Sequence, residues 1–317
     1  MDFDGYSRAV RDADVGFVLT HPETQKWRLE RTEFRNTCLQ LGCDGGGSIA
    51  DGISRSDTAI LIWRVGSSPE DIYLNGELIG DDDLILLEPG SHFIFASRGP
   101  RRWNSVALPV CTFGERVGMS RCGSRAVVLS SPGSAEWLSL LSANIYRAAV
   151  SGLPTEELEQ ALIDGCLEAL SASAHCETGR SDCFSKVGTA LRALHRQDRL
   201  NCRIDELCDE LGLRERTLLR AFHRVVGMGP KHYLLLRQLN IIRRALLDPA
   251  HSERHVTDVL TDCGVSELGR VAGQYKNLFG ELPSKTLRCV RHTHHRGRIR
   301  SISDLSLHAA SGDSGKL

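Results

Sequence analysis

The 317-residue chain has no long hydrophobic run. No apolar stretch approaches the ~18 residues that a membrane-spanning helix needs. The first residues, MDFDGYSRAV, lack the basic and apolar regions of a secretory signal, so we expect no membrane partner and a cytoplasmic location. An apolar content of 41% and a charged content of 25% are ordinary for globular proteins and exclude collagen-like and wholly disordered chains.

The sequence also lacks the spacings that carry metal, redox or catalytic chemistry. Its 11 cysteines include no CxxC pair, which excludes the zinc-finger and thioredoxin patterns. We expect reduced thiols, with a redox-sensing cysteine as the alternative. No HExxH, Ser-His-Asp or paired-carboxylate arrangement has a supporting context, and His92 has no nearby second ligand of the kind that a metal-binding cupin needs. We therefore predict no enzyme activity, no cofactor and no metal site.

Charge is divided unevenly along the chain. Residues 1–186 carry 26 acidic and 17 basic side chains, whereas residues 187–317 carry 14 acidic and 22 basic ones. The near-zero net charge of −1 hides this division. An acidic first part joined to a basic last part indicates a globular domain followed by a domain that binds a polyanion.

The first 130 residues are expected to form a β-rich domain. Segments rich in β-branched and aromatic residues alternate with turn residues, which is typical of a small barrel or sandwich. Asn75-Gly76 and Pro89-Gly90 each lie between two apolar runs, and we expect a hairpin at each. The glycine-rich stretch 43–52 lacks GK[ST] and is expected to be a flexible loop rather than a phosphate loop. The expected strands are 57–65, 72–79, 84–97 and 103–110.

A helical period begins near Ser134. Residues 131–180 are expected to be a helical linker, a dimerisation surface or both, with a hinge at 175–183. Residues 181–290 are expected to form an all-α domain. The polar tail 291–317 is basic and rich in small residues, and is expected to be disordered.

Residues 203–226 have the layout of a helix-turn-helix. Leu207 and Cys208 lie on the buried side of the first helix, and Gly212 allows the sharp turn. Leu218 and Phe222 lie on the buried side of the second helix. Its opposite face can contact guanine bases or phosphates. The predicted DNA-binding residues here are Arg214, Arg216, Thr217, Arg220, His223 and Arg224.

The same layout recurs about 50 residues later, at 255–280. Gly264 is the expected turn, and Ser266 is the expected N-cap of the second helix. Val271, Tyr275 and Phe279 are expected to be buried. Gly269 and Gly273 are expected on the outer face, where they would let DNA approach closely. The predicted DNA-binding residues are Ser266, Glu267, Arg270, Gln274, Lys276 and Asn277.

The segment 230–247 between the two copies is strongly helical and is expected to join them rigidly. One helix-turn-helix spacing is a weak signal. Two copies in matching order, joined by such a helix, are a much stronger one. Cys208 and Cys263 are expected to be small packing residues.

These residues resemble the AraC/XylS family of bacterial transcription regulators. The resemblance covers roughly 187–288 and rests on GLRERTLLRAFHRVVGMGPKHYLLLRQL and GVSELGRVAGQYKNLFGELPSKTLR. The segment LGRVAGQYKNLFG is most similar to the ethanolamine-operon regulators of the family. Arg214 stands where the family commonly has serine, and Gly273 stands where it commonly has arginine.

The resemblance implies a multidomain α+β fold, with an N-terminal cupin-like sensor domain and a C-terminal all-α domain that contains two helix-turn-helix motifs. It implies a transcription activator that binds double-stranded DNA and contacts RNA polymerase in the bacterial nucleoid. It also implies a small-molecule effector and a homodimer. The alternatives are a regulator controlled by protein contacts, with no small ligand, and a cupin enzyme tethered to DNA.

Overall fold

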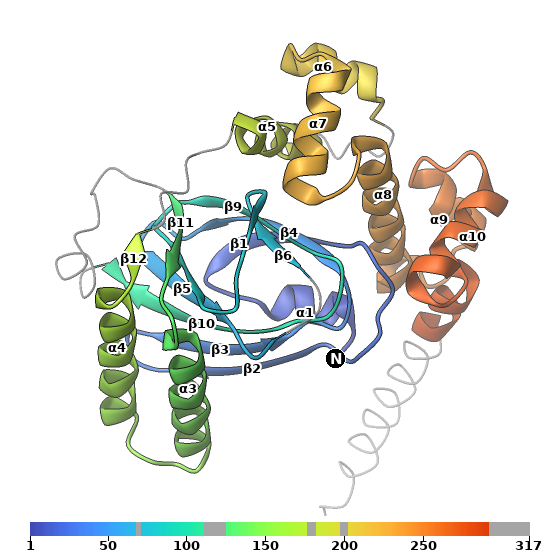
Figure 1. Ribbon diagram of the computed structural model, residues 1–317. Coiled ribbons are helices and arrows are strands. Elements are labelled where there is room, and N and C mark those ends of the chain that lie inside the picture. Colours follow the sequence, from blue (N-terminus) through green and yellow to red (C-terminus); the bar gives the residue numbers. More distant parts are fainter. Residues whose placement is uncertain (68–70, 111–124, 176–181, 197–201, 292–317) are drawn as a thin grey trace, which may run out of the picture. The chain divides into compact units, whose positions relative to one another are not determined.

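The computed structural model describes residues 1–67, 71–110, 125–175, 182–196 and 202–291 (Figure 1). Its contacts divide the chain into two units, residues 1–234 and residues 235–317. This division falls later than the border expected at residue 181. The reason is that, among the helices following residue 181, α7 packs on strands β9 and β6 of the first unit, and α5 and α6 pack against α7.

The first unit contains two antiparallel sheets. The five-stranded sheet has the order β1-β4-β9-β6-β7, and the seven-stranded sheet has the order β12-β11-β8-β5-β10-β3-β2. A short helix, α1 (Phe3–Ala9), precedes the strands. The strands are β1 (Ala13–Leu19), β2 (Arg28–Glu33), β3 (Cys38–Cys43), β4 (Ser48–Ser54), β5 (Thr58–Arg64), β6 (Ile72–Leu74), β7 (Glu77–Leu78), β8 (Asp83–Leu87), β9 (His92–Ser97), β10 (Arg102–Pro109), β11 (Ala126–Ser130) and β12 (Ala174–His175).

One of the two predicted hairpins is present. Asn75 and Gly76, with φ of 56° and 87°, connect β6 to β7, as a two-residue turn of the favoured type requires. The hairpin expected at Pro89-Gly90 is wrong, because β8 and β9 belong to different sheets and the turn carries the chain between them. The expected loop at 43–52 is also wrong in its second half, since β4 begins at Ser48 and pairs with both β1 and β9.

Two long helices share their core with the seven-stranded sheet. They are α3 (Ser134–Val150) and α4 (Thr155–Ser171), and they lie side by side in Figure 1. Leu138 of α3 and Leu162 of α4 are fully buried in one cluster with Leu61 of β5 and Val106 of β10. The chain then returns to the same sheet through β12. The segment expected as a linker is therefore built into the β-rich domain.

A second pair of helices, α5 (Asp182–Arg196) and α7 (Glu215–Val226), belongs to the same unit and packs together. The ring of Phe184 in α5 stacks on His92 of β9, with 5.2 Å between ring centroids. His92 Nε2 lies 2.7 Å from the buried Asp51 carboxylate of β4, and His195 Nδ1 lies 3.7 Å from the same carboxylate. Helix α7 contacts β9 and β6. The five-stranded sheet therefore carries α5 and α7 on one face.

The remaining helices are α6 (Ile204–Leu211), α8 (Pro230–Leu247), α9 (Val256–Asp262) and α10 (Leu268–Phe279), with a 3-10 turn at Pro249–His251. The bounds of α8 confirm the helix expected at 230–247, and the division between the two units falls within it. In the second unit, Gln238 Nε2 donates a hydrogen bond to the carbonyl oxygen of Cys263, which ties α8 to the end of α9.

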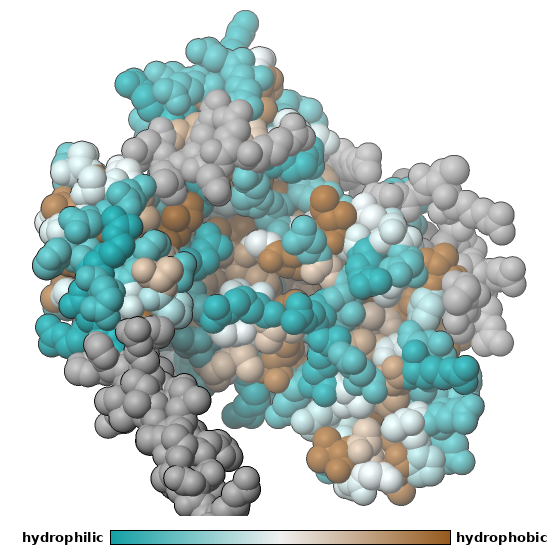
Figure 2. Space-filling model, turned by 180° about the vertical axis from the view of Figure 1, so that it is seen from behind, coloured by the Kyte–Doolittle hydropathy of each residue, from teal (hydrophilic) through white to brown (hydrophobic). Residues whose placement is uncertain are grey.

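Among the described residues, no helix combines the length and the apolar character needed to cross a bilayer. Figure 2 shows a face on which apolar side chains form small separate patches among hydrophilic ones. The expected tail 291–317, apart from Arg291, and most of the expected hinge 175–183 lie outside the described residues.

Candidate nucleic-acid interface

The first helix-turn-helix is formed by α6 and α7. Gly212 ends α6 with φ of 63°, a left-handed conformation that glycine adopts without strain. The next helix starts with Arg214 at its N-cap, and no side-chain hydrogen bond caps it. Leu218 and Phe222 are 0% exposed, and the Phe222 ring lies 5.7 Å from that of Tyr233. The core predicted for this motif is confirmed.

The opposite face of α7 is rich in exposed cations. Arg216 and Arg220 are exposed, and neither has an ion-pair partner in the part of the chain that the structure describes. Because their charges are not neutralised there, both guanidinium groups are available to phosphates or guanine edges. Of the other predicted residues of this motif, Thr217 is half-buried. The remaining three are exposed: Arg214, His223 and Arg224.

Arg224 lies next to the β-rich domain. Burial raises the pKa of Glu77 in the β6–β7 hairpin. The positive charge of Arg224 lowers the same pKa, which shows that the Arg224 guanidinium lies near the Glu77 carboxylate. A Cβ atom on Gly76 would lie 2.9 Å from the carbonyl oxygen of Arg224, so this approach of hairpin and helix requires glycine. Arg224 therefore belongs to an intramolecular contact, unlike Arg216 and Arg220.

The second helix-turn-helix lies in the second unit and is formed by α9 and α10. Gly264 has φ of 75° in the turn, and Val259 of α9 and the C-cap residue Cys263 are buried. Val271 and Tyr275 are buried on α10 as predicted. The prediction for Phe279 needs correction. Phe279 is half-buried beneath the Arg243 guanidinium, at 4.8 Å, and the neighbouring Leu278 is the buried residue.

Ser266 does not cap α10. The helix begins at Leu268, its N-cap is Glu267, and no side-chain hydrogen bond caps it. Ser266 remains exposed one residue before the cap, so it is a residue of the turn. The preceding residue, Val265, is buried in the core at 6% exposure, and helix α10 starts three residues after it.

The outer face of α10 differs from that of α7. Gly269 and Gly273 are exposed, and no heavy atom lies within 4 Å of a Cβ built on either. The Arg270 guanidinium lies 3.4 Å from the Glu267 carboxylate, so this cation has a local partner that DNA would have to displace. Of the remaining predicted residues of this motif, Gln274 is half-buried, and Lys276 and Asn277 are exposed.

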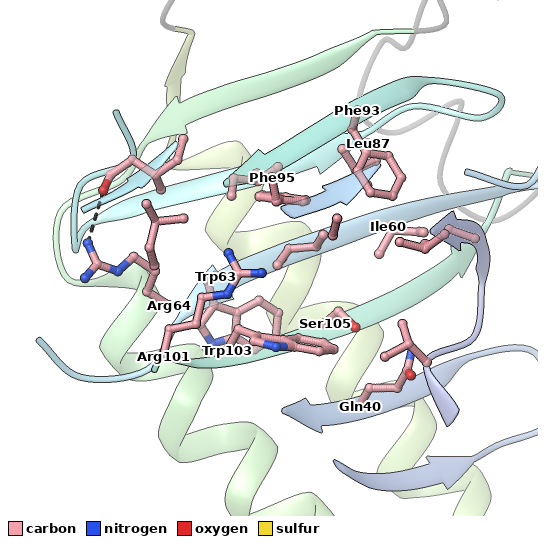
Figure 3. Close-up of a pocket in the computed structure, with 18 of the residues that line it drawn as sticks. Gln40, Ile60, Trp63, Arg64, Leu87, Phe93, Phe95, Arg101, Trp103 and Ser105 are labelled. Carbon is pink, nitrogen blue, oxygen red and sulfur yellow. Dashed lines mark hydrogen bonds between the residues drawn. The ribbon is translucent and has the colours of Figure 1, made fainter. Parts of the chain in front are cut away.

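The β-rich domain encloses a small apolar cavity of about 80 Å³ (Figure 3). Trp63, Phe93 and Phe95 line it, and its polar edge holds Arg64 and Arg101. Both arginines are already paired. Arg101 Nε donates to the Asp44 carboxylate at 2.5 Å, and Arg64 Nη1 lies 2.8 Å from Asp81. Since Tyr6 Oη and Trp103 Nε1 also donate to Asp44, the polar groups at this end are satisfied by one another.

Several cysteines are packing residues. Burial raises the pKa of the Cys166 thiol to about 12 and that of Cys38 to about 11. The pKa values of Cys208 and Cys263 are also raised by burial. Because the thiolate is the reactive form, these four thiols are poor nucleophiles near neutral pH.

The comparison with protein families matches the C-terminal part of the chain. Residues 207–288 match the family model described as "Helix-turn-helix domain". The chain is 39% identical over 88 residues to the "XylDLEGF operon transcriptional activator" of Pseudomonas putida, which covers 28% of this chain and 27% of that protein. It is 35% identical over 124 residues to the "XylDLEGF operon transcriptional activator 3" of the same species, covering 38% of this chain and 37% of that protein.

The matches thus cover only 27% and 37% of the length of these relatives. The chain also aligns with a solved structure titled "Crystal structure of the AraC-like transcriptional activator CuxR", with 14% identity and a TM-score of 0.37 over 73% of this chain and 86% of that one. Together with the geometry of α6, α7, α9 and α10, the family match defines a C-terminal helical helix-turn-helix domain that follows an N-terminal β-rich domain.

Proposed function

We propose that this protein is a sequence-specific DNA-binding regulator of transcription, of the AraC/XylS type. One observation carries the proposal. Two helix-turn-helix units expose polar or cationic outer faces, in the part of the chain where residues 207–288 match a helix-turn-helix family model, and the chain is 39% identical over 88 residues to an operon activator. The two second helices, α7 and α10, would enter successive major grooves, and exposed basic side chains would neutralise phosphates.

The finer parts of the proposal concern partners. By the same resemblance, the protein would activate transcription through RNA polymerase in the bacterial cytoplasm, act at the nucleoid, and pair with a second copy. Its β-rich domain would sense a small molecule. The likeness to ethanolamine-operon regulators stays a prediction.

Binding of the full chain to duplex DNA tests the proposal. We expect the affinity to fall steeply with salt, by a slope of about −0.9 in log–log terms for each phosphate neutralised. The measurement is fluorescence polarisation of a labelled duplex across a salt series. A chain that binds no duplex at low salt, or one whose affinity is independent of salt, would contradict the proposal.

Two alternatives give different results. A regulator controlled only by protein contacts would show no thermal shift with any small molecule. A cupin enzyme tethered to DNA would contain a bound metal. Among the described residues, no group of three or more His, Cys, Asp or Glu side chains is arranged to hold a metal ion, so nothing in that part favours the enzyme. Metal analysis of the purified protein separates the enzyme from a regulator.

A further inference from the structure

One large apolar side chain lies on the cationic outer face of α7. Leu219 is 43% exposed, and it is the one exposed large apolar side chain of α6 and α7, both of which the structure describes in full. Residues three and four apart share a face of a helix. Leu219 therefore lies beside Arg216 and His223, three positions before it and four positions after it. Arg220 follows it directly, so polar and cationic side chains surround this leucine.

The tip of Leu219 lies against the turn that follows α7. A Cβ atom built on Gly229, in the turn between α7 and α8, would lie 3.3 Å from Leu219 Cδ1. The core side of the helix is filled by Leu218 and Phe222, which are both 0% exposed. Leu219 is thus held by the bare backbone of the turn on one side, while the rest of the side chain faces outward.

A leucine on a face that reads base edges has one suitable target. Its hydrocarbon side chain can neither hold a phosphate nor pair with the polar atoms of a base. In the major groove, thymine alone of the four bases presents an apolar group, its C5-methyl, and apolar side chains contact that group. Opposite any other base, leucine would cover hydrogen-bonding atoms without satisfying them, which is unfavourable.

We propose that Leu219 selects thymine within the block of bases that α7 reads, by van der Waals contact with the C5-methyl group. The inference rests on the proposed function, because it assigns a base to one residue of that DNA interface. A helix rises about 1.5 Å per residue and duplex DNA about 3.4 Å per base pair. For a helix that follows the groove, the thymine therefore lies one or two base pairs from the position nearest to Arg216.

The outer face of α10, a helix that the structure also describes in full, carries no equivalent side chain. Gly269 and Gly273 occupy this face. The exposed leucine of α10, Leu268, comes three and seven residues before the buried Val271 and Tyr275, so it belongs to the other side of the helix. Selection of a methyl group is therefore expected in the α7 block alone.

The test begins with a duplex that the full chain selects from random DNA. Each thymine of the selected site is replaced in turn by uracil, which removes the methyl group and keeps the hydrogen-bonding edge of the base. Fluorescence polarisation should show one thymine in the α7 block whose replacement weakens binding about fourfold, the effect of one buried methyl group. At the same position, 5-methylcytosine should bind about fourfold more tightly than cytosine.

Variants assign this effect to one side chain. Leu219→Ala should bind the thymine and uracil duplexes equally at that position, and Leu219→Met, which keeps an apolar side chain, should retain the difference. The matched control is Leu282→Ala, which removes a leucine of similar exposure, 45%, outside α7 and should also retain the difference. Thermal melting verifies that each variant is folded, as expected for changes at exposed positions.

Equal binding of the thymine and uracil duplexes at every position would overturn the inference. So would a methyl effect that survives Leu219→Ala, or one confined to the block that Arg270→Ala relaxes. A chain that binds no duplex refutes the proposed function and this inference with it. A chain that selects a site without any methyl effect refutes this inference alone.

Discussion

At the level of single residues, the second helices of the two helix-turn-helix motifs expose different kinds of side chain, and the proposed contact with DNA would differ between them. The exposed face of α7 carries Arg216 and Arg220, long side chains that reach outward. The exposed face of α10 carries Gly269 and Gly273, which leave the backbone bare. The first face is suited to long-range charge contacts and the second to close approach of the backbone.

Gly273→Leu tests this contrast. Because no atom lies within 4 Å of a Cβ at this position, leucine should fit in the free protein. Glycine in a helix costs about 1 kcal/mol relative to alanine, so the melting temperature should stay the same or rise. DNA binding should weaken, because the side chain occupies the space of the approaching duplex. Gly273→Ala is the matched control and should raise stability with a smaller effect on DNA. A variant that fails to fold would show that Gly273 packs inside.

The cysteines give a second prediction at this scale. With the pKa of Cys166 raised to about 12 by burial, its thiol should resist alkylation of the native protein at pH 8. The exposed Cys289 should be modified before Cys166. Mass spectrometry of peptides from native and urea-unfolded protein measures both. Rapid labelling of Cys166 in the native state would mean that its surroundings open readily.

At the level of elements, the turn of the first helix-turn-helix depends on one backbone conformation. Gly212 has φ of 63° and open space around it, so a side chain there would be strained by its backbone and not by a clash. Gly212→Ala should lower the free energy of unfolding by about 1–2 kcal/mol in urea titration. Gly269→Ala, inside a helix, is the control and should not destabilise. Equal stability of Gly212→Ala and wild type would contradict the assigned turn.

Local sequence patterns predicted most of the helices and strands. They failed where a contact between distant segments determines which strands pair or where a helix begins. Asn75-Gly76 was predictable because the turn type itself demands positive φ at both residues. Pro89-Gly90 marks a real turn, but whether the chain pairs back or crosses to another sheet depends on which sheet the next strand joins. Ser266 has the chemistry of an N-cap, and the burial of Val265 delays the start of the helix past it.

At the scale of the whole molecule, the sequence predicted the order of domains but not how far the first one extends. The change of charge and of hydrophobic period marks a β-rich part and a helical part. Neither signal shows that α3 and α4 complete a core with β5, or that Phe184 stacks on His92 of β9.

In the proposed function, one chain reads DNA with two helices, α7 and α10. Two helix-turn-helix units joined by the stiff helix α8 should place their reading helices about 34 Å apart, one turn of duplex. Each chain should then read two short blocks of bases spaced by about 10 bp. The second block should be read less stringently, because Gly273 leaves α10 without the arginine common in the family.

Selection of binding sites from random DNA, with wild type, Arg216→Ala and Arg270→Ala, tests this claim most directly. Arg216→Ala should relax preference in one block and Arg270→Ala in the other, by about 1–3 kcal/mol each if the contact is a bidentate pair with a base. A phosphate contact would weaken all sequences alike and reduce the salt slope by about one. Arg147→Ala, an exposed arginine of α3, is the control and should leave both blocks unchanged. Two separate blocks, each relaxed by one variant, are the predicted result; a single undivided block, or both variants relaxing the same bases, would contradict it.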